Sequence, residues 1–155
     1  MCLVNGRAIG GGAELTLMTD FRLFTPSGQL AFVQSQMGVT TGFGGGKPLV
    51  DLIGSREALK LLIGCERVDP QRALSLGLCD AIIEDEENAV EEAEKFMLKL
   101  VHKLEPEVIH AAKSIVLNAI RSQDIKTAYF NERTYFAPLW GGEANKKALG
   151  SNKKH

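Results

Sequence analysis

The sequence predicts an α/β protein in which short strands joined by glycine turns are followed by a helical region. Residues 1–83 hold short apolar or alternating segments of strand length, bounded by Gly, Pro, Asn and Asp. Residues 84–155 hold longer segments whose apolar residues recur at helical spacing. We therefore expect a partial α/β core over 1–83 and a C-terminal helical region over 84–155.

The first part of the chain alternates strands with turns. Met1 to Val4 is apolar and indicates a buried strand that runs into a glycine turn, and a helix over 13–19 follows that turn. Residues 20–24 alternate polar and apolar side chains, which is the period of a half-buried strand. The Thr-Pro-Ser-Gly turn at 25–28 separates this strand from the next. The expected strands are 3–5, 20–24, 30–33 and 78–83.

The helices that follow have recognisable ends. Asp69 is a capping carboxylate placed before Pro70 at the first helical position, and Gly77 closes that helix. Gly54 separates two earlier helices. Gly141 and Gly142 separate the last helix from a lysine-bearing tail that we expect to be solvated. The expected helices are 49–53, 55–64, 70–77 and 89–103, with two more that open at Pro106 and Asp124.

Composition and charge exclude several classes of function. The net charge of -1 and the dispersed Lys and Arg residues give no basic patch for nucleic acid. No run of eighteen apolar residues is present, so we expect no membrane span. Cys2, Cys65 and Cys79 lack CxxC spacing and show no ligand pattern with the three histidines. We expect reduced thiols in a cytosol-like compartment and no metal site.

The segment Asn5–Glu14 is the strongest candidate for chemistry. Gly10, Gly11 and Gly12 let the backbone approach a ligand closely, and their N–H groups lie at the positive end of the helix that begins here. Such donors suit an oxygen that becomes negative during a reaction. Glu14 falls one helical turn further on and faces the same pocket. The alternative is that the glycines only allow close packing and that Glu14 complements the helix dipole.

A second glycine-rich segment spans residues 36–46. It contains five glycines in eleven residues, which disfavours a regular element. We interpret it as a second backbone-lined wall of the pocket, or alternatively as a mobile connector.

Several motifs occur here in the order typical of the crotonase, or enoyl-CoA hydratase/isomerase, superfamily. They are the glycine turn, Asp20-Phe21-Arg22, the loop from Phe32 to Gly45, Ile53-Gly54-Ser55-Arg56-Glu57-Ala58-Leu59-Lys60 and Ala73-Leu74-Ser75-Leu76-Gly77-Leu78. The resemblance implies the C-terminal part of a ββα spiral followed by a helical trimerisation region. It also implies an acyl-CoA thioester substrate, no separate cofactor because CoA is part of the substrate, and assembly as a homotrimer or hexamer.

Two further segments resemble the ethylmalonyl-CoA decarboxylase branch of this superfamily. They are Phe32-Val33-Gln34-Ser35-Gln36-Met37-Gly38 and Leu139-Trp140-Gly141-Gly142-Glu143-Ala144-Asn145. That branch removes CO2 from ethylmalonyl-CoA, and less well from methylmalonyl-CoA, in the cytosol. Family members are nearly twice as long as this chain. The resemblance therefore implies a missing front half that would supply much of the CoA surface and one donor of the oxyanion hole.

The resemblance also implies roles for individual residues. Gly11 matches a backbone donor of the oxyanion hole, and Glu14 matches the first catalytic carboxylate, whose pKa we expect burial to raise. Gln36 stands where hydratases have their second carboxylate. Because an amide does not exchange a proton near neutral pH, Gln36 disfavours hydration. Further substrate-binding residues implied by the pocket are Gly10, Gly12, Gln36, Gly44 and Gly45.

Two alternatives to the decarboxylase remain at this point. One is a non-catalytic, truncated crotonase-like protein that acts through oligomerisation. The other is an active enoyl-CoA hydratase or isomerase, which hydration of a crotonyl thioester would support.

Overall fold

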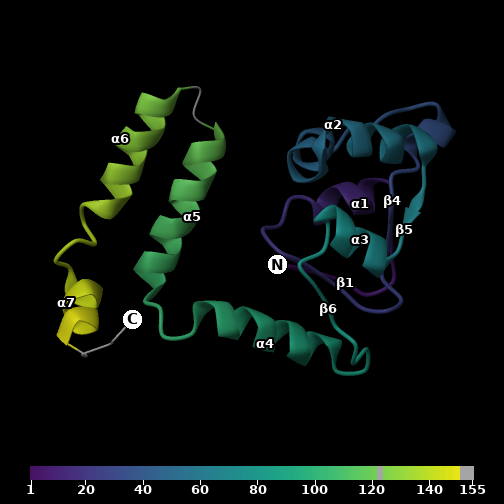
Figure 1. Ribbon diagram of the computed structural model, residues 1–155. Helices are drawn as coiled ribbons and strands as arrows, with labels where there is room; N and C mark the ends of the chain where they lie inside the picture. Colours follow the sequence, from purple (N-terminus) through teal and green to yellow (C-terminus); the bar gives the residue numbers. More distant parts are fainter. Residues whose placement is uncertain (122–123, 151–155) are drawn as a thin grey trace. The chain divides into compact units, whose positions relative to one another are not determined.

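The computed structural model describes residues 1–121 and 124–150, and the chain forms two compact units that divide between Met97 and Leu98 (Figure 1). The first unit is a mixture of short strands and helices. The second unit, within the described residues, is helical.

The strands of the first unit form two small sheets. In one sheet, β1 (Cys2–Val4) pairs in parallel with β3 (Arg22–Phe24), and β3 pairs in parallel with β6 (Ala81–Ile82). In the other, β2 (Arg7–Ile9) pairs in parallel with β4 (Gln29–Ala31), and β4 pairs antiparallel with β5 (Arg67–Val68). Strands, turns and helices thus alternate along the chain, as the sequence predicts for this part.

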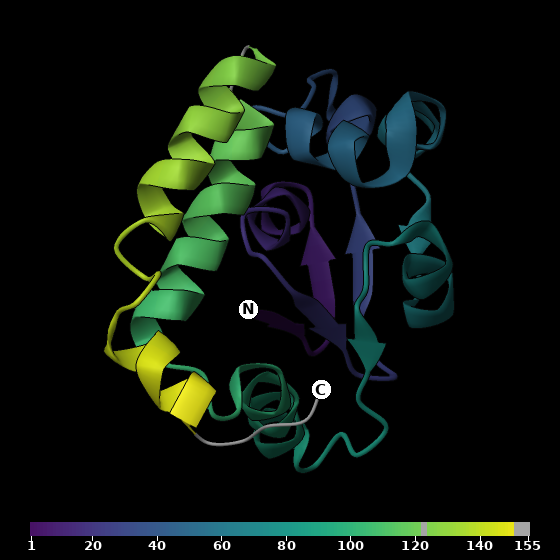
Figure 2. The ribbon, with the colours of Figure 1, turned by 60° about the vertical axis from the view of Figure 1, so that its left-hand side comes forward.

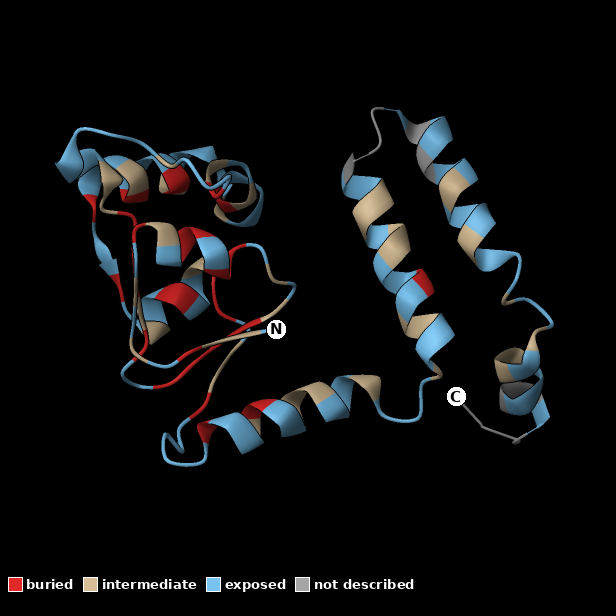
Figure 3. Cartoon of the chain, turned by 180° about the vertical axis from the view of Figure 1, so that it is seen from behind, coloured by how far each residue is buried: buried red, intermediate tan, exposed pale blue. Residues whose placement is uncertain are grey.

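Burial follows the position of each strand in its sheet. The central strand β3 is buried along its whole length, whereas the edge strand β2 exposes Arg7 and Ile9. Figure 3 shows the buried residues of the first unit gathered on its strands and on the inner faces of its helices. The largest fully buried apolar side chains are Phe24, Phe32, Leu23, Leu30, Leu49, Leu61, Leu78 and Val68.

Glycine and proline positions set the helix ends of the first unit. The helix α2 (Gly46–Gly64) is kinked at Gly54, whose φ of 78° and ψ of 161° are not helical. The helix α3 (Pro70–Leu76) begins after Asp69, whose side chain accepts a hydrogen bond from the Arg72 amide at 2.7 Å, and ends at Gly77 with φ of 80°. The predicted break at Gly54 and the predicted ends of α3 are confirmed.

Two further helices lie wholly or partly in the first unit. The helix α1 (Gly11–Thr16) follows β2 directly. The helix α4 (Ala89–Val101) buries Ala89 and Ala93, and its Phe96 ring meets Phe21 edge-on with centroids 6.3 Å apart. It begins in the first unit and ends in the second.

The second unit contains a helical hairpin. The helices α5 (Pro106–Arg121) and α6 (Ile125–Phe136) run side by side in Figures 1 and 2, and α7 (Glu143–Gly150) follows. Asn118 donates a hydrogen bond from Nδ2 to the Tyr135 hydroxyl at 3.1 Å and accepts one from Asn131 at 3.2 Å. These polar contacts fix the register of the two helices.

The structure differs from the sequence prediction at several elements. The strands β2 and β5 are not predicted, because two or three residues carry no periodicity and are defined by pairing with β4. The predicted helix over 13–19 begins earlier and ends at Thr16. The supposed loop begins with a short 3-10 helix, η1 (Gln34–Met37), and α7 replaces the first part of the predicted tail. Lys153 and Lys154 lie outside the described residues.

Candidate active site

The first feature of the site is the N-terminus of α1. Gly10 is the N-cap, with φ of 59°, and its amide donates to the Ala31 carbonyl of β4 at 2.8 Å. This positive φ favours glycine. Gly11 and Gly12 open the helix, where backbone amides have no acceptor within the helix itself. The strand pairing of β2 with β4 therefore fixes where the Gly11 amide lies.

The Glu14 carboxylate is the best-connected group of this region. It is 2% exposed. Its Oε1 accepts hydrogen bonds from Gln34 Nε2 at 2.8 Å and from the Gly42 amide at 3.3 Å. Its Oε2 accepts from the amides of Phe43 and Gly45, both at 2.9 Å. Four donors therefore surround one buried carboxylate, and three of them come from the backbone of a single loop.

These donors decide the charge of Glu14. Burial alone raises its pKa, but the hydrogen bonds from the Gly45 amide, the Gln34 side chain and the Gly42 and Phe43 amides outweigh burial and lower the pKa below its ordinary value of 4.5. The expectation of a raised pKa for Glu14 is therefore wrong. Glu14 is an anion near neutral pH because each donor favours its charged form.

The loop over 38–45 is held tightly against α1. Gly44 has φ of +92°, and a Cβ built on Gly45 would lie 2.6 Å from Glu14 Cγ. A Cβ built on Gly11 would lie 2.6 Å from Cε2 of Phe43. Glycine at 11 and at 45 thus allows α1 and the loop to touch. The two glycine-rich segments therefore lie side by side, with Glu14 between them.

Gln34, rather than Gln36, contacts the carboxylate. Gln36 lies exposed on η1, whereas Gln34 donates to Glu14 and its own Oε1 is buried without a hydrogen-bond partner among the described residues. Sequence reasoning missed Gln34. Its signal was a polar residue two positions after Phe32, at the end of a buried segment.

The remaining predicted substrate contacts stay predictions. Gly10, Gly12, Gly44 and Gly45 line the same region, although the Gly45 amide already donates to Glu14. Within residues 1–121 and 124–150, no group of three or more His, Cys, Asp or Glu side chains is arranged to hold a metal ion. In the same ranges, no helix is both long and apolar enough to cross a membrane.

A helix that opens on glycines, carries a buried carboxylate and packs against a glycine loop is the feature to compare with known classes of protein. The sequence profile described as "Enoyl-CoA hydratase/isomerase" matches residues 1–148, and the chain belongs to this family. The resemblance identified from the motifs is thereby confirmed.

Several similar relatives within the family share one enzyme name. The ethylmalonyl-CoA decarboxylase of Xenopus tropicalis is 42% identical over 156 residues, which cover 100% of this chain and 52% of that protein. The same enzyme from Mus musculus is 43% identical and is covered to 48%, and that from Homo sapiens is 39% identical and is covered to 50%. This chain spans about half the length of the curated relatives it matches.

Solved structures agree on the fold. A putative enoyl-CoA hydratase from Thermobifida fusca YX, solved in complex with acetoacetyl-CoA, superposes with a TM-score of 0.81 at 27% identity. That match covers 90% of this chain and 53% of the other. The enoyl-CoA hydratase from Bacillus anthracis superposes with a TM-score of 0.86 at 26% identity, covering 94% and 55%. The predicted α/β crotonase fold is thereby confirmed.

Proposed function

We propose that this protein acts on acyl-CoA thioesters and decarboxylates ethylmalonyl-CoA, and methylmalonyl-CoA less well. The observation that carries the proposal is the Gly11 amide at the head of α1, one turn from the buried carboxylate of Glu14. The names of relatives at about 40% identity support the choice of reaction. The acetoacetyl-CoA bound to a structural relative supports the substrate class.

The proposed reaction uses the thioester as its own electron sink. The bond between C2 and the carboxylate breaks, CO2 leaves, and the electron pair moves into an enolate whose oxygen becomes negative. The Gly11 N–H donates to that oxygen, and loss of such a donor costs about a hundredfold to a thousandfold in rate. A proton then adds to C2 and gives the saturated acyl-CoA, so the chemistry itself calls for no metal or separate cofactor.

Glu14 has an organising role in this proposal. Its lone-pair positions are occupied by four donors, and its lowered pKa leaves no proton on it near neutral pH. We therefore assign it the task of holding the loop over 42–45 beside α1, with the proton reaching C2 through water. Gln36 is an amide on an exposed turn of η1, and this disfavours the two-carboxylate hydration route.

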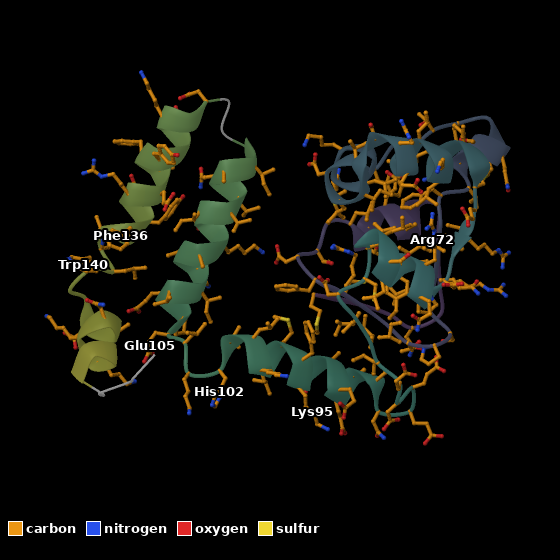
Figure 4. The ribbon with its side chains drawn as sticks, viewed as in Figure 1. Arg72, Lys95, His102, Glu105, Phe136 and Trp140 are labelled. Carbon is orange, nitrogen blue, oxygen red and sulfur yellow. The ribbon has the colours of Figure 1, made fainter. Side chains whose placement is uncertain are left out.

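Assembly as a homotrimer or hexamer is part of the same proposal. In the second unit, Phe136 and Trp140 pack with ring centroids 5.4 Å apart, yet Trp140 is 71% exposed (Figure 4). With Leu104, Leu139 and Val108 they line a cavity of about 370 Å³. Exposed apolar side chains of this size are typical of an interface. Light scattering coupled to gel filtration tests this, and a monomeric mass would contradict it.

The compartment proposed is the cytosol. Cys2, Cys65 and Cys79 are all free thiols, and the pKa of Cys2 and of Cys79 is raised by burial, which disfavours the reactive thiolate. Fractionation of cells that express the endogenous protein tests this assignment, and a membrane-enclosed location would contradict it.

The deciding experiment follows CO2 release from ethylmalonyl-CoA by the complete gene product that carries this chain. We expect butyryl-CoA and CO2 in equal amounts, and a loss of about a hundredfold in kcat for Glu14→Gln, because the loop over 42–45 is no longer held in place beside α1. Glu57→Gln is the matched control, because Glu57 pairs with Lys60 and Arg72 on the surface. Unchanged turnover in Glu14→Gln would remove Glu14 from the mechanism.

A parallel assay with crotonyl-CoA separates the alternatives. Hydration without decarboxylation would favour a hydratase. A folded wild-type protein inactive in both assays would favour a non-catalytic role.

A further inference from the structure

Phe43 combines a fixed backbone with an exposed ring. Its amide donates to the buried Glu14 carboxylate at 2.9 Å, whereas its side chain is 70% exposed. The ring is exposed although its backbone is anchored, because Gly42 before it and Gly45 two residues after it also donate their amides to Glu14. The ring is therefore presented to solvent from a rigid position.

The ring lies against Gly11. The three atoms nearest to the position of a Cβ on Gly11 all belong to Phe43, namely Cε2 at 2.6 Å, Cδ2 at 2.9 Å and Cζ at 3.6 Å. Since a Cβ lies about 2.5 Å from its own backbone nitrogen, the edge of the ring is within about 5 Å of the Gly11 amide nitrogen. An oxygen that accepts a hydrogen bond of about 2.9 Å from the Gly11 amide therefore lies within about 8 Å of the ring edge.

The loop backbone that carries Phe43 has little room to move. Gly45 is pressed against Glu14 Cγ, so the loop cannot approach α1 further. Gly44 has φ of +92°, and a Cβ built on it would lie 3.7 Å from Cε of Met18, which also limits movement of the loop.

We propose that Phe43 is a specificity-determining residue that contacts the acyl group of the bound thioester. This inference rests on the proposed function and deepens it. With the thioester oxygen on the Gly11 amide, the carbon next to the carbonyl and its alkyl substituent lie within reach of the ring. Each methylene that the ring removes from water strengthens binding by about fourfold. The ring therefore selects thioesters with an ethyl-sized substituent over acetyl.

The test compares dissociation constants by calorimetry for the complete gene product. The probes are free CoA, acetyl-CoA, butyryl-CoA and the unreactive branched 2-ethylbutyryl-CoA. We expect wild type to prefer 2-ethylbutyryl-CoA to acetyl-CoA by about sixteenfold, because the ring covers one ethyl group, and each of its two carbons contributes about fourfold. Phe43→Ala is expected to abolish this preference while its affinity for free CoA stays within about twofold of wild type, and Phe43→Trp is expected to retain it.

Met37→Ala is the matched control, because Met37 is an apolar side chain of the same segment and is 77% exposed. It is expected to keep the wild-type ratio. Far-UV circular dichroism and thermal melts check that the Phe43 variants are folded. We expect them to be folded, because the ring is exposed and its removal leaves no cavity in the core.

The outcomes separate the two proposals. If wild type prefers the longer acyl groups and Phe43→Ala prefers them equally, the role of Phe43 is overturned and the proposed function stands. If wild type binds no thioester better than free CoA, the thioester function itself is overturned. If Phe43→Ala weakens free CoA and all thioesters alike, the ring supports the loop and does not select the acyl group.

Discussion

The α-carbon of Gly45 lies against the side chain of Glu14, and its amide donates to the Glu14 carboxylate at 2.9 Å. A Cβ at position 45 would come within 2.6 Å of Glu14 Cγ and 3.1 Å of its Cα. The φ of -70° at Gly45 suits any residue, so packing rather than backbone conformation requires glycine here.

Gly45→Ala should therefore destabilise the protein by overpacking, by roughly 1–3 kcal/mol. Urea unfolding at pH 7 measures this. Gly42→Ala is the matched control, because a Cβ on Gly42 meets nothing within 4 Å and the Gly42 amide is retained. We expect the control to stay near wild type. If Gly45→Ala were as stable as Gly42→Ala, the loop would have to relieve the clash by moving.

Glu14→Gln should lower stability at pH 7 by roughly 2–4 kcal/mol, because the amide side chain offers one oxygen where four donors need acceptors and turns its own N–H toward backbone amides. Urea midpoints compared with those of Glu57→Gln check this. A stable Glu14→Gln variant would mean that the loop amides find water instead.

The pH dependence of stability, compared between wild type and Glu14→Gln, tests the charge of Glu14. Its folded-state pKa lies below the ordinary value of 4.5, so its contribution to stability is present above pH 4.5 and is lost as the pH falls through the folded value. Glu86 and Asp85 also have lowered pKa values and titrate in the same window, so wild type alone does not isolate Glu14. The difference between wild type and Glu14→Gln should shrink from pH 6 to pH 3. A difference that grows would mean that the pKa of Glu14 is raised.

Local signals predicted the parts of the fold that local chemistry controls. The kink at Gly54, the Asp69 cap and the end of α3 at Gly77 each depend on one or two neighbouring residues. The strands β2 and β5 depend on pairing with β4, which no pattern within two or three residues records.

In the candidate site, too, the features set by residues distant in sequence were not predicted. The positions of Gly11 and Glu14 at the head of one helix follow from the glycine turn alone. The charge of Glu14 does not, because its donors Gly42, Phe43 and Gly45 lie 28 to 31 residues further along the chain. The sequence could predict that Glu14 is buried, but not that the amides of a distant loop lower its pKa.

A second carboxylate anchors the turn after β3. Thr25 is fully buried, and its hydroxyl donates to Glu86 Oε1 at 2.8 Å, while the Ser27 hydroxyl donates to the same oxygen. Thr25→Val keeps the volume but removes the donor, and should lower Tm by roughly 2–6 °C. Glu86→Ala should then cost less in the Thr25→Val background than in wild type. Additive changes in Tm would show that the two residues act independently.

Gln34→Glu should reverse the pH dependence of the site. It replaces the donor that lies 2.8 Å from Glu14 Oε1 with a second buried carboxyl, and two like charges at that distance raise the pKa of the pair. A carboxyl whose folded-state pKa is raised above its unfolded value lowers stability progressively as the pH rises from the unfolded value through the folded one. The variant should therefore be less stable than wild type at pH 7 and should recover part of the loss at pH 5. Gln34→Leu removes the donor without adding charge and should show no such recovery. Matching profiles for the two variants would mean that the new carboxyl turns away from Glu14 into solvent.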